Sequence, residues 1–203
     1  MFVQVIQGQV ANPEQVRAAL DRWAQELAPG ADGWLGSTAG VTEEDGIFIA
    51  LARFESEEAA RRNSARPEQD QWWTETSKLF TAEPSFRDSR EVDVDLVGNP
   101  DDAGFVQVIQ GRSTDPDRAR ALMQQDSGEW AKFRSDILGS VQVEHEGGAF
   151  TTALYFTSEK EAREGERKEP PPELKALMDE MDKLSAEPPR FYDLKQPWLY
   201  SPR

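Results

Sequence analysis

The apolar positions of the chain follow one pattern that occurs twice. Residues 2–8 read FVQVIQG, and the same seven letters return at residues 105–111. Nearly continuous apolar runs of this kind are typical of strands that are covered on both faces. Residues 12–13 and 115–116 then give an N-cap side chain followed by proline, which predicts a helix start in each half.

The similarity between the halves continues beyond these strands. WLGS at 34–37 corresponds to ILGS at 137–140 at the same spacing. ALARFESEEAAR at 50–61 corresponds to TALYFTSEKEAR at 152–163, with one residue deleted. The second half is therefore a diverged copy of the first.

Each half predicts the order strand, helix, strand, strand, helix, strand, with the last strand of the first half near 86–95. We expect one repeat over residues 1–96, a linker rich in turn formers at 97–104, and a second repeat over 105–203. This order predicts a four-stranded antiparallel sheet with helices on one face, the ferredoxin-like plan. Because the strands are apolar on both sides, we expect the two sheets to pack against each other.

The element order, the NPE and DPD helix starts and the RF-ES-EEA junction resemble the antibiotic biosynthesis monooxygenase-like domains of the dimeric α/β-barrel superfamily. The segment NSARPEQDQWW resembles tandem actinobacterial members of that family. The resemblance implies an α+β fold in which two ferredoxin-like (βαββαβ) repeats form a dimeric α/β barrel within one chain. It also implies a monomeric pseudo-dimer and leaves further homodimerisation open.

The family includes cofactor-free oxygenases of polycyclic phenols and haem-degrading enzymes. Haem-degrading relatives place an asparagine late in the first strand, where this chain has Gln7 and Gln110. They and some oxygenases carry a tryptophan on the helix after the third strand, where this chain has Asn63 and Gly165. The family's haem-ligating histidine has no match in the last long helix of either half, so the resemblance disfavours haem degradation.

Two residues are catalytic candidates. Arg53 ends the third strand, where relatives often carry an arginine near the cavity mouth, and a cation there could stabilise an oxyanion. A salt bridge to a nearby glutamate is the alternative. In the first helix of the second half, Asp126 stands on the expected buried face, at the position of Trp23 in the first half. A buried acid needs a partner or a raised pKa, which is typical of a general base. If Gly128 ends that helix, however, Asp126 is a solvated end residue.

The ligand-binding candidates are amides and aromatic residues. Trp72 and Trp73 could stack on an aromatic ligand, although core packing explains them as well. The full set consists of Gln7, Asn63, Trp72, Trp73, Gln110 and Tyr155. His145 is the single histidine and is expected at a surface hairpin, with its glutamate neighbours on the other strand face. We therefore expect no metal site.

Composition and the absence of known motifs limit the expected partners, cofactors and localisation. The chain has no cysteine and a formal net charge of −15, so nucleic acid and anionic membranes are poor partners. We find no secretory signal, membrane-spanning run, phosphate-binding loop or metal-ligand spacing, and we expect a cytoplasmic protein without a cofactor.

These observations give two hypotheses for function. The first is a protein that binds a small hydrophobic or aromatic molecule, with cofactor-independent monooxygenation of an aromatic or polyketide-like substrate as the implied activity. The second is a non-enzymatic binding or assembly module whose cavity is filled by its own side chains. Because Trp23, Arg53 and Asn63 are not kept in the second half, we expect one open cavity, in the first half. The alternative is that Asp126 marks the second half as the active one.

Overall fold

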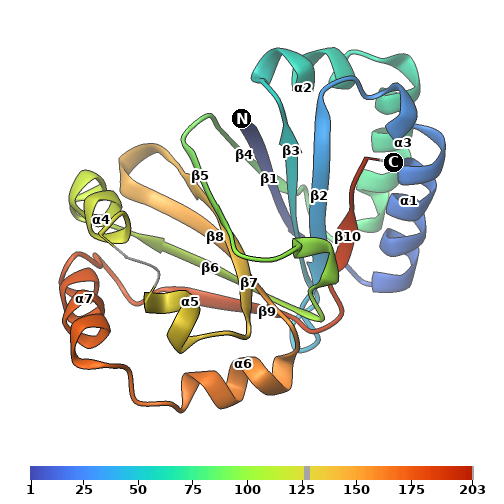
Figure 1. Ribbon diagram of the computed structural model, residues 1–203. Coiled ribbons are helices and arrows are strands. Elements are labelled where there is room, and N and C mark those ends of the chain that lie inside the picture. Colours follow the sequence, from blue (N-terminus) through green and yellow to red (C-terminus); the bar gives the residue numbers. More distant parts are fainter. Residues whose placement is uncertain (126–128, 203) are drawn as a thin grey trace. The chain divides into compact units, whose positions relative to one another are not determined.

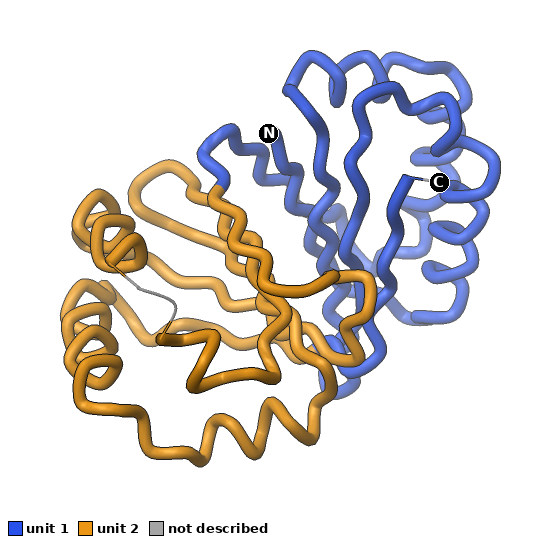
Figure 2. The backbone as a smooth tube through the Cα atoms, viewed as in Figure 1, with its two compact units in different colours: residues 1–92, 194–203 blue, residues 93–193 orange. Residues whose placement is uncertain are grey.

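The computed structural model describes residues 1–125 and 129–202. The chain forms two compact units, which Figure 2 distinguishes by colour. Unit 1 consists of Met1–Val92 together with Leu194–Arg203, and unit 2 consists of Asp93–Asp193. The last residues of the chain therefore belong to the same unit as the first.

Unit 1 contains a five-stranded antiparallel sheet in the order β10-β2-β3-β1-β4. Its strands are β1 (Phe2–Gln9), β2 (Trp34–Val41), β3 (Ile47–Phe54), β4 (Ser85–Ser89) and β10 (Trp198–Tyr200). Its helices are α1 (Pro13–Glu26), α2 (Glu57–Ser64) and α3 (Pro67–Thr76), with 3-10 turns at Ala28–Gly30 and Ser77–Leu79.

Unit 2 contains a second five-stranded sheet in the order β5-β7-β8-β6-β9. Its strands are β5 (Val92–Leu96), β6 (Phe105–Arg112), β7 (Ile137–Glu144), β8 (Ala149–Phe156) and β9 (Arg190–Leu194). Its helices are α4 (Pro116–Met123), α5 (Glu129–Phe133), α6 (Glu159–Glu166) and α7 (Pro172–Lys183), with 3-10 turns at Pro100–Asp102 and Glu146–Gly148.

The helix starts predicted from the sequence are confirmed. The Asn12 side chain accepts a hydrogen bond from the Gln15 backbone N–H at 3.2 Å, and Pro13 is the first residue of α1. Asp115 caps α4 in the same way through the Arg118 backbone N–H at 3.0 Å. Each cap pairs one of the backbone donors that a helix start leaves without a partner.

In unit 1, α1 and α3 lie side by side on one face of the sheet (Figure 1). Val16, Ala19 and Trp23 form the buried face of α1. The indole N–H of Trp72 on α3 donates to the Ala19 carbonyl at 3.0 Å and joins the two helices. The helices are thereby held at a fixed spacing above the strands.

Two edge strands, β5 and β10, were not predicted as separate strands from the sequence. The single strand expected near 86–95 is interrupted, and its two parts, β4 and β5, belong to different sheets. At the other end of the chain, the short strand β10 pairs with β2. The compact units therefore differ from the ranges 1–96 and 105–203, because pairing across the sequence decides where these short strands belong.

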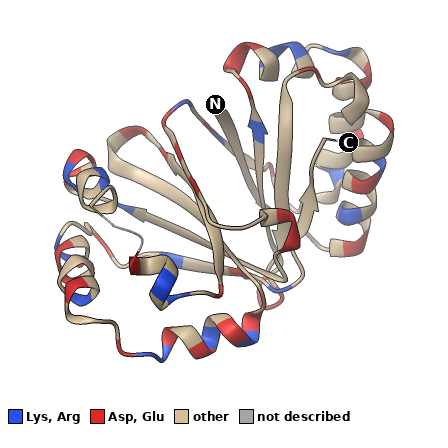
Figure 3. Cartoon of the chain, in the orientation of Figure 1, with Lys and Arg blue, Asp and Glu red and all other residues tan. Residues whose placement is uncertain are grey.

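The α+β class and the ferredoxin-like sheet order are confirmed in both units. The packing of one sheet against the other stays a prediction. Figure 3 shows that charged residues gather on helices and connections, whereas the central strands carry few. Among residues 1–125 and 129–202, no helix is both long and apolar enough to cross a membrane.

Candidate functional site

A cavity of about 290 Å³ lies between the helices and the sheet of unit 1. Four of the six tryptophans of the chain line it, namely Trp23, Trp34, Trp72 and Trp73. The floor comes from alternate residues of the strands, including Ile6 of β1, because successive side chains on a strand point to opposite faces. The cavity volume is just below the usual range of ligand pockets, about 300–1,000 Å³.

Three of the four tryptophans that line this cavity, Trp23, Trp34 and Trp72, donate their indole N–H to an acceptor within the protein. Trp23 Nε1 donates to Gln69 Oε1 at 2.6 Å, and Trp34 Nε1 donates to Ser37 Oγ at 3.0 Å. The Trp23 and Trp34 rings meet edge to face, with centroids 5.0 Å apart and an interplanar angle of 76°. Since these polar edges are paired, the rings offer mainly apolar surface to a ligand.

The polar group that stands out in this cavity is the Thr76 hydroxyl. Thr76 lies at the end of α3, is only 3% exposed and lines the cavity. Its Oγ1 has no hydrogen-bond partner among the described residues. A buried hydroxyl without a partner lowers stability, and a ligand oxygen placed beside it would remove that penalty.

Tyr200 contributes a phenol from the other end of the chain. Its hydroxyl donates to Asp21 Oδ1 at 2.8 Å, and its ring lines the cavity. Burial raises the pKa of Tyr200, and the hydrogen bond to Asp21 raises that pKa further. The phenol therefore stays neutral at physiological pH.

Three of the residues predicted from the sequence meet at this cavity. Asn63, Trp72 and Trp73 all line it, and both tryptophans do so although they are adjacent on α3. Asn63 is buried, and its Oδ1 accepts a hydrogen bond from Arg66 Nη1 at 3.0 Å. The Asn63 amide is therefore held in place from outside the cavity.

Gln7 and Arg53 are not brought to the cavity. Their strand neighbours Ile6 and Ala52 line it, so alternation places Gln7 and Arg53 on the opposite face of the sheet. The expectation that Arg53 lies near the cavity mouth is corrected by this register, in which Arg53 pairs with Val3 of β1. Its Nε is buried without a hydrogen-bond partner among the described residues.

The strand candidates of the second half also lie on the face of their sheet away from the cavity. Gln110 and Tyr155 do not line the unit 2 cavity, whose strand residues include Ile109 and Thr152. Tyr155 is fully buried, and Gln110 Nε2 donates to Thr151 Oγ1 at 3.4 Å. Asp126 lies outside the described residues.

His145 is partly buried and not fully exposed at the hairpin. Its Nε2 lies 3.0 Å from Thr151 Oγ1, so the ring is fixed against β8. Within the part of the chain that the structure describes, no group of three histidine or acidic side chains could hold a metal ion.

A second cavity, of about 450 Å³, lies in unit 2. The expectation of one open cavity, in the first half, is therefore corrected. Sequence reasoning also missed Thr76 and Tyr200 as cavity residues. Tyr200 could not be found from local pattern, because β10 meets β2 only in the folded chain.

Comparison with protein-family models gives no match for the chain, and comparison with curated proteins gives none either. Solved structures, however, share the fold over nearly the whole chain. A "putative monooxygenase" from Lactobacillus acidophilus superposes with a TM-score of 0.75 at 14% identity, covering 98% of this chain and 95% of that one. A second "putative monooxygenase", from Fusobacterium nucleatum, gives 0.74 at 8% identity, covering 98% and 94%.

A third structure, of an anthrone oxidase-like protein, gives a TM-score of 0.66 at 13% identity, covering 98% of this chain and 92% of that one. At these identities the likeness shows a common fold. The chain is thus a two-repeat α+β protein with the fold of these three proteins, as the resemblance in its sequence predicts.

Proposed function

We propose that the protein binds a flat aromatic molecule with oxygen substituents in the unit 1 cavity and oxidises it with O₂ without a cofactor. The observation that carries the proposal is a cavity walled by four tryptophans that also contains the unpartnered Thr76 hydroxyl. Aromatic walls favour flat aromatic ligands, and the hydroxyl favours a ligand oxygen at one position. The names of the three structural neighbours support this class of reaction.

The proposed reaction converts a ring methylene flanked by aromatic rings into a carbonyl. A base removes one methylene proton, the carbanion passes an electron to O₂, and the two radicals join through a new C–O bond. Loss of the second proton and cleavage of the O–O bond then give the carbonyl and water. Asp70 is the carboxylate among the lining residues and the candidate base, while Thr76 positions the substrate oxygen.

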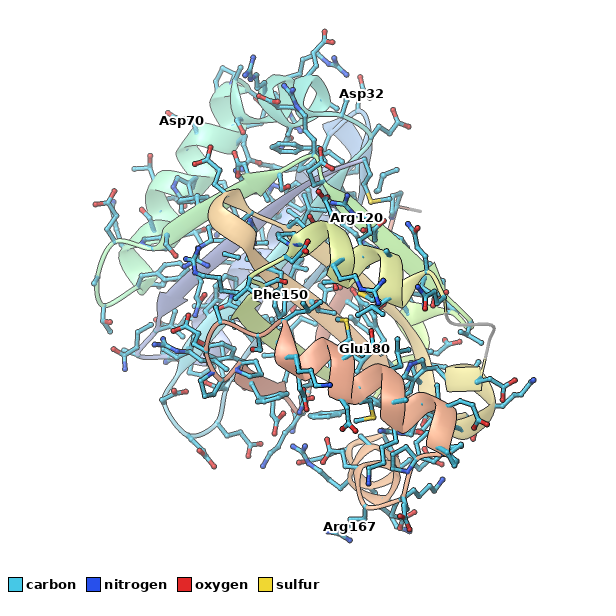
Figure 4. All side chains as sticks on the ribbon, turned by 90° about the vertical axis from the view of Figure 1, so that its left-hand side faces the viewer. Asp32, Asp70, Arg120, Phe150, Arg167 and Glu180 are labelled. Atoms are coloured by element: carbon cyan, nitrogen blue, oxygen red, sulfur yellow. The ribbon has the colours of Figure 1, made fainter. Side chains whose placement is uncertain are left out.

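A second function, ligand binding without chemistry, is favoured by one observation. Asp70 is exposed on α3 and labelled in Figure 4, so water solvates its carboxylate. A general base is more effective when burial raises its pKa toward neutrality. An exposed Asp70 fits a binding protein that holds its ligand without deprotonating it.

Fluorescence and O₂-uptake measurements with anthrone distinguish oxidation from binding alone. We expect anthrone to quench the tryptophan fluorescence with one site per chain. An oxygen electrode should record one O₂ consumed per anthraquinone formed, above the rate without protein and above that of Asp70→Asn. Quenching without O₂ uptake would leave binding alone, and absence of quenching would overturn both functions.

Replacement of Thr76 by valine tests the proposed hydrogen bond. The change keeps the shape and removes the hydroxyl, so anthrone should bind roughly two- to tenfold more weakly, as for loss of one hydrogen bond. Anthracene, which has no oxygen, should bind Thr76→Val and the wild type equally. The melting temperature should stay the same or rise, because the hydroxyl has no partner in the free protein.

Thr74→Val is the matched control, since Thr74 is exposed on the same helix. It should change neither affinity. An equal loss of anthrone and anthracene binding in Thr76→Val would contradict the role of the hydroxyl.

A further inference from the structure

The unit 2 cavity differs in chemistry from the unit 1 cavity. Three of the four methionines of the chain line it, namely Met123, Met178 and Met181. Trp130 is the one tryptophan among its lining residues. Leu177, five residues after the start of α7 at Pro172, stands where α3 has Trp72, five residues after Pro67. Methionine and leucine side chains are flexible and adapt to flexible apolar ligands, whereas rigid aromatic walls favour flat rings.

Equivalent residues of the two repeats form part of the floor of each cavity, but the rest of the lining comes from different elements. Ile6 and Phe48 of unit 1 correspond to Ile109 and Phe150 of unit 2, and all four line a cavity. The unit 1 cavity continues to α2, where it includes Asn63. Among its described lining residues, the unit 2 cavity has none from the equivalent helix α6.

Arg134 accounts for this difference. Its Nη2 donates to the Ala162 carbonyl of α6 at 3.2 Å, and a Cβ added at Gly165 would collide with its guanidinium. Arg134 therefore fills the space beside α6 in unit 2. The equivalent space beside α2 in unit 1 is part of the cavity and is lined by Asn63. The unit 2 cavity instead extends toward the β7–β8 hairpin, where Arg112 and Gly148 line it.

The entrance of the unit 2 cavity is apolar and open to solvent. Met123, Met178 and Phe191 line the cavity and are among the exposed large apolar residues of the chain, with Phe191 57% exposed. Figure 4 faces α4 and α7, which carry the two methionines, with Phe150 labelled. Clustered exposed apolar side chains beside a cavity are typical of a ligand entrance.

Arg112 is the cationic side chain among the lining residues and could bind an anionic head group. Glu144 lines the cavity, but Arg120 holds it through two hydrogen bonds at 3.2 and 2.6 Å. Arg112 donates to the Gly147 carbonyl and forms no ion pair within the described residues. Asp182, on α7, also lines the cavity and is exposed, so it places a negative charge on the rim.

We propose that unit 2 binds the unbranched alkyl chain of a medium-chain carboxylic acid, with the chain among Met123, Met178 and Met181 and the carboxylate at Arg112. A volume of about 450 Å³ is within the ordinary range of ligand pockets. This site is separate from the aromatic site of unit 1 and does not depend on the function proposed for it.

Isothermal titration with hexanoate, octanoate and decanoate, each below its micelle-forming concentration, tests the chain. One site per protein is expected, with affinity rising by up to about fourfold for each added methylene until the cavity is full. Unsaturable uptake that grows with chain length would show adsorption on the surface and would overturn the site. Absence of heat and of competition with a bound fluorescent fatty acid would overturn it as well.

Two variants test the placement of the ligand. Met178→Glu puts a charged group where the alkyl chain is proposed to lie and should lower decanoate affinity at least roughly tenfold, because the chain would desolvate that charge. Arg112→Met should weaken decanoate roughly two- to fivefold, the effect of an exposed ion pair, and leave decan-1-ol unchanged. Circular dichroism should show that both variants are folded.

Arg167→Met is the matched control for the arginine, since Figure 4 shows Arg167 beyond α6, away from Phe150. It should change neither affinity. Equal binding of decanoate by Met178→Glu and the wild type would place the ligand elsewhere. Equal effects of Arg112→Met on acid and alcohol would overturn the contact between Arg112 and the carboxylate.

Discussion

Replacement of Trp198 by alanine is expected to lower the free energy of unfolding of unit 1 by about 3–5 kcal/mol, the usual loss for a buried tryptophan. Trp198 is 7% exposed and packs in a cluster that includes Val16, Phe48 and Phe80. Its ring centroid lies 6.3 Å from that of Phe48. Without the indole, β10 loses its buried side chain and keeps only its backbone pairing with β2 and its partly buried residues.

Hydrogen exchange locates this effect. Backbone amides of β2 and β10 should exchange faster in Trp198→Ala, while those of β6 and β8 in unit 2 keep their protection. Deletion of residues 195–203 should have the same pattern with a larger amplitude, because it also removes the pairing of Trp198 with Ala39 and of Tyr200 with Ser37.

Lys195→Ala serves as the control beside the same strand. Lys195 forms an exposed ion pair with Glu43 at 2.9 Å, and its loss should change stability by less than about 1 kcal/mol. If Trp198→Ala behaved like Lys195→Ala, β10 would not be a structural part of unit 1.

Replacement of Arg134 by methionine is expected to lower the stability of unit 2 by about 3–5 kcal/mol. Arg134 and Asp136 are both buried and form two parallel hydrogen bonds, at 2.9 and 2.8 Å. The guanidinium also lies 5.5 Å from the centroid of the Phe156 ring. Its removal leaves the Asp136 carboxylate buried without its partner, which is the large part of the loss.

The double variant Arg134→Met with Asp136→Asn separates the charge from the packing. It removes the uncompensated carboxylate, so its stability should recover part of the loss, as measured by urea unfolding. Lys132→Met breaks an exposed ion pair between Lys132 and Glu129 within α5 and should have an effect below about 1 kcal/mol. Equal losses in the single and double variants would contradict the role assigned to the buried charge.

Local sequence signals were sufficient for most of the fold. The repeated FVQVIQG word became β1 and β6 because a short apolar run rich in valine and isoleucine favours a buried strand. Asn12 and Asp115 became caps because a side-chain oxygen satisfies the free N–H groups of a helix start within three residues. These interactions are local, so the sequence determines them alone.

The cavity was predicted only in part. Trp72, Trp73 and Asn63 were found because helical apolar positions and the resemblance both point to the helix side of the sheet. Gln7 and Arg53 were named as candidates but do not line the cavity, since an apolar run without alternation does not reveal which side chains meet the helices. Strand register, which only the fold fixes, decides that question.

The sequence by itself determined the duplication, the two sheets and the aromatic character of the first cavity. Tertiary structure decided the rest, because the deciding contacts join residues far apart in the chain. Tyr200 reaches the unit 1 cavity through the pairing of β10 with β2. Gly165 stands where the first repeat has Asn63 because Arg134 packs against α6, and no local pattern contains that contact.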